Sequence, residues 1–233
     1  EGIYNGYKGE GIYMSRSTDS GESWEQDSIR VSPIEVVSYA FPQIDAGDPG
    51  RIAITYLGSE DSSELGNLDI DGNDWDGNPH YATANITYHL YVTYSLNALD
   101  ENPVFHTVRA STDPVQIGAI CLNSGDCRDI GGSNRNLLDF NDLHIDREGR
   151  VYVAFADGCT GECATMDDPQ PEDSRSRRGS VYFLGSGPSL YESVGELSEF
   201  SPSIPMEADA NEFRPLLCRS EECKDESQKA NDD

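Results

Sequence analysis

One stretch decides the fold of this chain, Ser17-Thr18-Asp19-Ser20-Gly21-Glu22-Ser23-Trp24. Its fixed positions follow the spacing Ser-x-Asp-x-Gly-x-x-Trp. In a turn of this kind the Ser17 hydroxyl and the Asp19 carboxylate accept hydrogen bonds from backbone N–H groups. Gly21 takes a conformation that other residues resist, and we expect Trp24 to fold back over the turn as an apolar plug. The stretch therefore predicts a structural turn between two strands, not a catalytic site.

Alternating strands precede this turn and recur along the chain. Residues 11–17, 89–95 and 180–186 each alternate in polarity and end in a serine that opens a turn, the third being the poorest copy. Ser95-Leu96-Asn97, followed by Phe105, is a degenerate version of the first turn. The sequence thus predicts the same strand-and-turn element at three places.

A second repeat lies between these elements. Residues 41–56 and 140–155 align without a gap: each has an aromatic start, a Gly-Arg pair, alternating aliphatic residues and an aromatic end. Asp48-Pro49-Gly50 and Arg147-Glu148-Gly149 provide the conformations of a short hairpin. The second strand of each hairpin is apolar or small at successive positions, so we expect it to be buried on both faces between neighbouring sheets.

The Ser-x-Asp-x-Gly-x-x-Trp spacing is the Asp-box, and with the repeats it makes the chain resemble the sialidase-like (bacterial neuraminidase repeat) β-propeller superfamily over residues 9–186. The resemblance implies an all-β fold, a β-propeller of four-stranded antiparallel blades, with about two and a half blades present. Rings in that superfamily have six or more blades, so further sequence, or another copy or chain, would complete the ring. We expect residues 1–204 to form blades and residues 205–233 to form an acidic tail that is a linker, a docking strand or disordered.

The composition limits the classes of molecule that the chain can bind. The chain of 233 residues has 43 acidic and 16 basic residues and a net charge of −27. Such a charge repels phosphate backbones and anionic lipid, and it suits divalent cations and a high-salt, halophilic or marine setting. No stretch reaches the roughly 18 apolar residues that a membrane-spanning helix needs. We therefore expect neither nucleic-acid binding nor membrane insertion.

The six cysteines form three close pairs: Cys121 with Cys127, Cys159 with Cys163, and Cys218 with Cys223. Such spacing allows local disulfides that pin loops, and zinc is the alternative. Disulfides imply an oxidising environment, so the expected location is secreted or at the cell surface. Asn85-Ile86-Thr87 is a glycosylation sequon, which is compatible with export.

The strand order also predicts which edge carries function. In a four-stranded meander, turns after strands one and three share one edge, and the other connections share the opposite edge. The long connections, residues 57–87, 111–138 and 157–179, all fall on the edge opposite the Asp-box. Long loops on a rigid scaffold are where ligands bind, so we expect the functional site there.

Three candidate sites lie in these connections. Oxygen ligands at alternating positions predict a calcium site, with a solvated acidic loop as the alternative; no organic cofactor is expected. A polar segment that leads into an innermost strand offers the guanidinium of Arg135 and the carboxylates of Asp139 and Asp142 to a ligand. The alternative is that Arg135 and Asp139 form a buried ion pair or cap the strand. A basic cluster near residues 157–163 suits a carboxylate or sulfate, or balances local charge. The residues are Asp69, Asp71, Asn73 and Asp76 (calcium), Arg135, Asp139 and Asp142 (ligand), and Arg175, Arg177 and Arg178 (basic cluster).

The resemblance implies a glycan as the partner, but it does not imply catalysis. A sialidase needs three arginines around the sugar carboxylate, a Tyr/Glu nucleophile pair and an Asp acid/base, and none of these matches a position of this sequence. The Phe/Tyr-Arg-Ile-Pro motif of that family is also missing. We expect a glycan-directed propeller portion, either a binding module or part of an exo-glycosidase. The alternative is a non-catalytic surface protein for adhesion or assembly.

Overall fold

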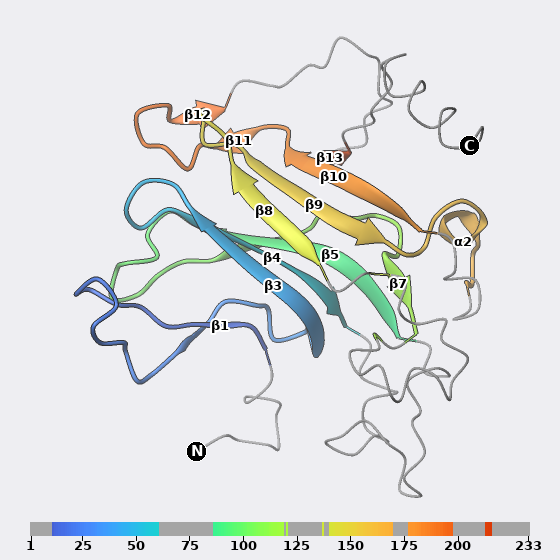
Figure 1. The fold of residues 1–233 in the computed structure, drawn as a ribbon, viewed down its shortest axis with the longest axis horizontal. Coiled ribbons are helices and arrows are strands. Elements are labelled where there is room, and N and C mark those ends of the chain that lie inside the picture. Colours follow the sequence, from blue (N-terminus) through green and yellow to red (C-terminus); the bar gives the residue numbers. More distant parts are fainter. Residues whose placement is uncertain are drawn as a thin grey trace, which may run out of the picture.

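The computed structural model describes residues 11–60, 86–118, 120, 137, 140–169 and 177–197, and the backbone of residues 213–215. These residues form antiparallel β-sheets and one helical turn, so the all-β prediction is confirmed (Figure 1). No helix in this part of the chain has the length and apolar character needed to cross a membrane. The elements are β1 (Tyr13–Met14), β2 (Ile29–Arg30), β3 (Ser38–Ala46), β4 (Ile52–Ser59), β5 (Thr87–Ser95), β6 (His106–Arg109), β7 (Gln116–Ile117), β8 (Asn141–Ile145), β9 (Val151–Asp157), α2 (Glu162–Thr165), β10 (Arg178–Leu184), β11 (Gly187–Pro188), β12 (Glu196–Leu197) and β13 (Phe213–Pro215).

Two meandering sheets carry most of the structure. In the first sheet the strand order is β3-β4-β5-β6, with β7 also paired to β5. In the second sheet the order is β8-β9-β10-β13. A short β1–β2 pair precedes them. Strands β3 to β6 and strands β8 to β10 therefore follow one another in space as they do in the chain.

The two predicted hairpins share one register. In the first sheet Gln43 lies opposite Thr55, and in the second Asp142 lies opposite Ala154. The same offset of 99 positions, from Phe41 to Phe140, relates three further ladder pairs of β8–β9 to pairs of β3–β4. The fifth pair, Asn141 with Phe155, has no counterpart, because the register of β3–β4 shifts between Ala40 and Gln43. Identical register places equivalent residues on equivalent faces, since successive side chains of a strand alternate between faces. The repeat seen in the sequence is thus a repeat in three dimensions.

The first sheet is covered on both faces. Ala53 and Leu57 of β4 join a core with Val153 and Phe155 of β9 on the side of the second sheet. On the other side, strand β4 and Tyr91 of β5 contact the chain around β1 and β2, where the cluster is Ile12, Val31, Val36, Ile54, Tyr56 and Tyr91. Strand β4 is buried along almost its whole length, as the sequence predicts.

The expectation of burial on both faces is wrong for β9. Its residues alternate, and Ala154 is exposed while Val153 and Phe155 are buried. The reason is that only the face toward the first sheet has a neighbouring sheet in the described structure. We call the opposite side the outer face of the second sheet, defined by Asp142, Ala154, Ala156, Gly179 and Val181, which share a face by register.

The first strands of the two sheets, β3 and β8, lie side by side (Figure 1). The backbone N–H of Ile145 donates to Asp45 Oδ2 at 3.1 Å, and the Asn141 side-chain amide donates to the Phe41 carbonyl at 3.5 Å. Edge strands expose unpaired N–H and C=O groups. The contact with Asp45 thus gives a partner to one backbone N–H group on the edge of β8 that faces away from β9.

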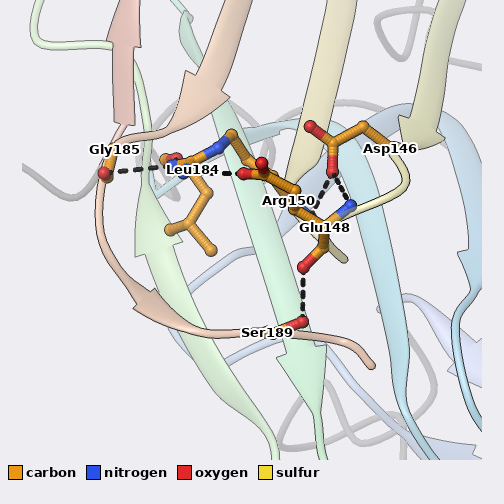
Figure 2. A network of polar contacts seen from close by, with 6 residues as sticks. All are labelled: Asp146, Glu148, Arg150, Leu184, Gly185 and Ser189. Atoms are coloured by element: carbon orange, nitrogen blue, oxygen red, sulfur yellow. Dashed lines mark hydrogen bonds and ion pairs between the residues drawn. The ribbon is translucent and has the colours of Figure 1, made fainter. Parts of the chain in front are cut away.

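The Gly-Arg hairpin of the second sheet is fixed by a network of polar contacts (Figure 2). Asp146 Oδ1 accepts the N–H groups of Glu148 and Arg150, which closes the turn. The Arg150 side chain is 1% exposed, and its Nη1 donates to the carbonyls of Leu184 and Gly185 at the end of β10. A buried guanidinium needs such partners, because an unpaired buried charge is strongly unfavourable. Arg150, at the start of β9, therefore ties the hairpin to the end of β10, the next strand of the sheet.

Each hairpin also docks on a later turn. The Leu190 N–H donates to the Gly149 carbonyl within the second sheet, just as the Ala98 N–H donates to the Gly50 carbonyl in the first. Across the sheets, the Asp48 N–H donates to the Leu190 carbonyl and Arg51 Nη1 donates to the Ser189 carbonyl at 3.0 Å. The hairpin of one sheet is thereby locked to the turn of the next.

The Asp-box turn forms the capping bonds that its sequence predicts. Ser17 Oγ accepts the Gly21 N–H at 2.8 Å, and Asp19 Oδ1 accepts the Ser23 N–H at 2.9 Å. The Asp19 carboxylate accepts hydrogen bonds from the Ser23 hydroxyl, the Ser23 N–H and the Ser17 hydroxyl, and these bonds lower its pKa to about 2. The prediction of an apolar plug is wrong: Trp24 lies close to Gly21 but is 62% exposed, because no other described residue closes over it.

The degenerate copy of the turn is confirmed. Asn97 Oδ1 accepts from the Ser95 hydroxyl at 3.2 Å and from the Val104 N–H at 2.9 Å, as Asp19 Oδ1 does from Ser17 and Ser23. An amide oxygen replaces a carboxylate oxygen with the same acceptor geometry. The two turns also touch, since Arg16 Nη1 donates to the Ala98 carbonyl at 3.1 Å.

Replacing Gly149 by alanine should destabilise the fold. Its φ is +78°, and an added Cβ would overlap Ser189 Oγ and the backbone nitrogens of residues 190 and 191. We expect Gly149→Ala to lower the free energy of unfolding by about 2–4 kcal/mol in urea titrations. Gly179→Ala is the control, because a Cβ there meets nothing within 4 Å. Equal effects of the two variants would contradict the close docking of the hairpin.

Candidate functional site

The structure separates two edges of the sheets. The Gly-Arg hairpins and the turns after β5 and β10 contact one another along one edge, as the hydrogen bonds between Gly50, Ala98, Gly149 and Leu190 show. At the opposite edge the Gly158 N–H, after β9, donates to the Val115 carbonyl, in the connection between the two sheets. In Figure 1 this edge carries α2 and β7 at the right of the view. The predicted division into a short-turn edge and a connection edge is confirmed for the described residues.

A disulfide fixes the connection edge. Cys159 and Cys163 are bonded, with their Cα atoms 5.3 Å apart, and α2 runs between them and just beyond. Both cysteines are buried and pack against Ile117 of β7. The predicted disulfide Cys159–Cys163 is confirmed, and it anchors the connection after β9 to the connection that joins the sheets.

The other two predicted disulfides are not among the bonds that the structure describes. Cys121 and Cys127 lie in the connection between the two sheets, and Cys218 and Cys223 lie in the acidic tail. All four cysteines fall outside the described residues. Of the three predicted disulfides, only Cys159–Cys163 is therefore confirmed, and the pairings of Cys121 with Cys127 and of Cys218 with Cys223 stay predictions.

Asp157 is the buried carboxylate at this edge. It ends β9, is 7% exposed, and its Oδ1 accepts the Cys159 N–H at 3.2 Å. Its Oδ2 lies 3.5 Å from Nη2 of Arg178, the first residue of β10. Burial raises the pKa of Asp157 to about 6, and the Cys159 N–H and the Arg178 guanidinium only partly offset this rise. A carboxyl group with a shifted pKa often marks a functional site, although ion pairs that only support structure shift pKa values as well.

A hollow of about 660 Å³ opens on the outer face of the second sheet, beside this edge. Its floor is formed by small and aliphatic residues, and Phe140, at its border, is 75% exposed. The polar groups around it include the carboxylate of Asp142 and the exposed guanidinium of Arg177. A concave surface with an aromatic ring and a few polar groups is the usual form of a small-molecule site. The lining residues are Phe140, Asn141, Asp142, Ala154, Phe155, Ala156, Arg177, Arg178, Gly179, Ser180 and Val181.

The hollow brings together parts of two predicted sites. Asp142, from the second, and Arg177 and Arg178, from the basic cluster, all line it. Asp157 ends β9 close by, but it shares a face with Arg178, its partner in the ladder, and not with Ala154 and Ala156. Segments that the sequence treats as two separate candidate sites therefore line one hollow, because β8 and β10 lie on either side of β9.

The remaining predicted site residues also lie outside the described part of the chain and stay predictions. Within the part that the structure describes, no group of three or more His, Cys, Asp or Glu side chains is arranged to hold a metal ion. The predictions concerned are the calcium ligands Asp69, Asp71, Asn73 and Asp76, the ligand residues Arg135 and Asp139, the basic residue Arg175, and the glycosylation site Asn85.

Sequence reasoning missed the surroundings of Asp157. Besides burial, the nearby Asp113 in the connection between the sheets raises the pKa of Asp157. Burial also raises the pKa of Tyr182, and the charges of Asp157 and Asp113 add to that rise. His89 also belongs to this edge: its Nδ1 lies 3.1 Å from the Asp113 carbonyl, and burial lowers its pKa. No motif links these residues, so only the fold shows that they are neighbours.

Comparisons of the chain with protein-family models, with curated proteins and with solved structures found no match.

The raised pKa of Asp157 predicts a pH-dependent stability. Folded, Asp157 keeps its proton up to about pH 6, whereas in the unfolded chain it ionises near 3.8, so its contribution to stability is lost as the pH rises between these values. Asp157→Asn removes this dependence. Relative to the wild type, the variant should gain about 2 kcal/mol of unfolding free energy between pH 4 and pH 7, measured by urea titration.

Asp142→Asn, at an exposed carboxylate of β8, controls for the loss of one negative charge. If Asp157→Asn and the wild type show parallel stability profiles from pH 4 to pH 7, Asp157 does not have the raised pKa that its burial implies.

Proposed function

We propose that this chain is part of a secreted β-propeller of the Asp-box kind and that it binds a glycan beside the connection edge of the second sheet. The propeller arrangement is supported by the shared register of the two hairpins and by the hydrogen bonds that lock each hairpin to a later turn. The β1–β2 pair would be the outer half of a preceding blade. Export is supported by the Cys159–Cys163 disulfide, because such bonds persist in oxidising compartments.

The observation that carries the glycan proposal is the exposed ring of Phe140 at a hollow that Asp142 and Arg177 also line. An aromatic ring offers a large rigid apolar surface to the C–H face of a sugar. A carboxylate accepts hydrogen bonds from hydroxyl groups, and a guanidinium donates several in a fixed geometry. Together these groups match a ligand that is apolar on one face and rich in hydroxyl groups at its rim.

Binding is better supported than hydrolysis. A glycosidase needs two carboxyl groups on either side of one bond, with one of them protonated near neutral pH. Asp157 has a suitable pKa of about 6, but it is buried and lies on the opposite face of β9 from Asp142. These two carboxyl groups therefore do not form a glycosidase pair, and a binding module is the function that the described residues fit.

A glycan array probed with the whole chain, with and without a calcium chelator, tests this function. We expect binding to a defined set of glycans, and calorimetry with the best of them should give affinities about tenfold weaker for Phe140→Ala and for Arg177→Ala, equivalent to about 1.4 kcal/mol each. Arg147→Ala is the matched control, since Arg147 is an exposed arginine at the opposite edge. Its affinity should stay within twofold of the wild type.

Two results would refute the proposal. One is the absence of any glycan signal in both conditions. The other is equal loss of affinity in the Arg177 and Arg147 variants, which would show that only overall charge matters. A fluorogenic sialoside assay on the same protein separates binding from hydrolysis, and we expect no turnover.

A further inference from the structure

We propose that the peptide bond between Arg178 and Gly179 is a processing site for an endoprotease that recognises two adjacent arginines. Arg177 and Arg178 are the only two adjacent basic residues in the sequence. Both are exposed, and they stand at the start of β10 on the connection edge. Cleavage there gives a two-piece protein whose pieces stay together. The site does not depend on the glycan that the hollow is proposed to bind.

The chemical step is the hydrolysis of one peptide bond. Water adds across the bond between Arg178 and Gly179, so that the C–N bond breaks. A carboxylate then ends the first piece at Arg178, and an ammonium group begins the second piece at Gly179. The endoprotease contributes subsites lined by carboxylates, because these bind guanidinium groups in a bidentate geometry.

The backbone at this bond is extended and open along one edge. Strand β13 pairs with residues 182–184 of β10, whereas residues 178–181 have a ladder partner only in β9 within the described structure. Endoproteases bind their substrates as an extended strand through backbone hydrogen bonds, much as a strand is added to the edge of a sheet. The segment around the bond therefore has the conformation that a protease binds.

The side chains around the bond leave room for a protease. Gly179 is exposed, and a Cβ added to it would meet nothing within 4 Å. The side chain of Arg178 is 57% exposed; its Nη2 lies 3.5 Å from Asp157 Oδ2, and its Nε donates to the Ser180 hydroxyl at 3.2 Å. An ion pair of a partly exposed arginine is weak, so the Arg178 guanidinium can turn into an acidic subsite.

Charge favours this place over the rest of the chain. The sequence has 43 acidic and 16 basic residues, so a protease with acidic subsites is repelled by most of it. Arg177 and Arg178 are a local exception. The disulfide Cys159–Cys163, at the same edge, indicates the oxidising setting in which secreted endoproteases act.

Exposure alone does not make such a site, as Arg147 shows. Arg147 is also exposed, but it lies in the Gly-Arg hairpin, where the N–H groups of Glu148 and Gly149 donate to Asp146. A protease would have to open this turn before the chain could lie extended in its cleft. Arg147 is therefore a matched arginine that is exposed but held in a turn.

The two pieces stay together because the second piece is anchored at the opposite edge. Leu184 and Leu190 are buried in the core between the sheets. The Leu190 N–H donates to the Gly149 carbonyl, and Arg150 Nη1 donates to the Leu184 carbonyl. Cleavage thus frees only the connection-edge end of β10, and it places an ammonium group at Gly179, which lines the hollow.

Limited proteolysis of the folded chain tests the site. One enzyme is a kexin-type endoprotease, which requires two adjacent basic residues, and the other is trypsin, which cuts after a single arginine. The variants are Arg178→Gln, Arg177→Gln, which keeps the contact of Arg178 with Asp157, and Arg147→Gln as the exposed control. Cut positions and rates are measured by mass spectrometry, and thermal unfolding shows that each uncut variant is folded.

The kexin-type enzyme should make a single cut, with a new N-terminus at Gly179. Arg178→Gln and Arg177→Gln should each slow this cut at least about tenfold, because one acidic subsite is left without its partner, whereas Arg147→Gln should change it less than about twofold. Trypsin should still cut Arg177→Gln after Arg178. In the wild type it should cut after Arg178 at least about tenfold faster than after Arg147. The cut protein should elute from gel filtration as one species.

The site is disproved if the kexin-type enzyme leaves the folded wild type intact while it cuts a synthetic peptide of residues 174–183. It is also disproved if trypsin cuts after Arg147 as fast as after Arg178. Separation of the two pieces on the column would overturn the assembled product. Cleavage is measured without a ligand, so a cut in a chain that binds no glycan keeps the site and removes the glycan function. Glycan binding by a chain that resists the enzyme does the reverse.

Discussion

The structure depends on the docking of each Gly-Arg hairpin against a turn that follows it. Gly149 leaves no room for a side chain because the Ser189–Tyr191 turn lies directly against it. The next residue, Arg150, places a buried guanidinium on the carbonyls that end β10. Gly47 has the same close approach to Leu190 from the first sheet. This constraint sets how far apart the sheets lie at this edge, and the core residues between them are packed to that spacing.

Fixing one edge in this way leaves the other edge free for long connections. The short turns satisfy their own backbone groups, as Asp19 and Asn97 show, so they need no help from the loops opposite. At the connection edge, order comes from the Cys159–Cys163 disulfide and its contact with Ile117. A rigid frame with a stapled connection is the arrangement on which binding sites are usually built. The hollow beside Phe140 lies next to this connection.

The chain carries its large negative charge without burying much of it. Of the described acidic residues only Asp157 is buried, and it lies beside Arg178. The other acidic side chains that the structure describes are partly or fully exposed, where water and salt screen their repulsion. Arg177 and Arg178 are therefore two exposed positive charges on a surface that is otherwise rich in acidic side chains. Their place at the hollow is the electrostatic reason to look there for a ligand.

Much of the fold was predictable because it depends on patterns among residues that are close together in the sequence. The Gly-Arg hairpins, their strands and the capping bonds of Ser17 and Asp19 follow from turn chemistry and alternation, which need only neighbouring residues. The plug role of Trp24 and the two-sided burial of β9 were wrong, since burial depends on what lies against a surface. The lining of the hollow was predictable in part, because Asp142 and Arg177 were already candidate residues in the sequence. Phe140 was not, because it comes to line the hollow only when β8, β9 and β10 pair. The neighbourhood of Asp113, Asp157 and Tyr182 has no local signal at all.

The central claim is that the two sheets of the repeat meet along their first strands, β3 and β8. The backbone amide of Ile145 reports on this contact, because it points out of the β8 edge and donates to Asp45 Oδ2. Its hydrogen-exchange rate, measured by NMR in the wild type and in Asp45→Ala, is the most direct test. The structure predicts an amide protected in the wild type and exchanging markedly faster in the variant. An Ile145 amide that exchanges at the rate of an open edge strand in both proteins would contradict the account.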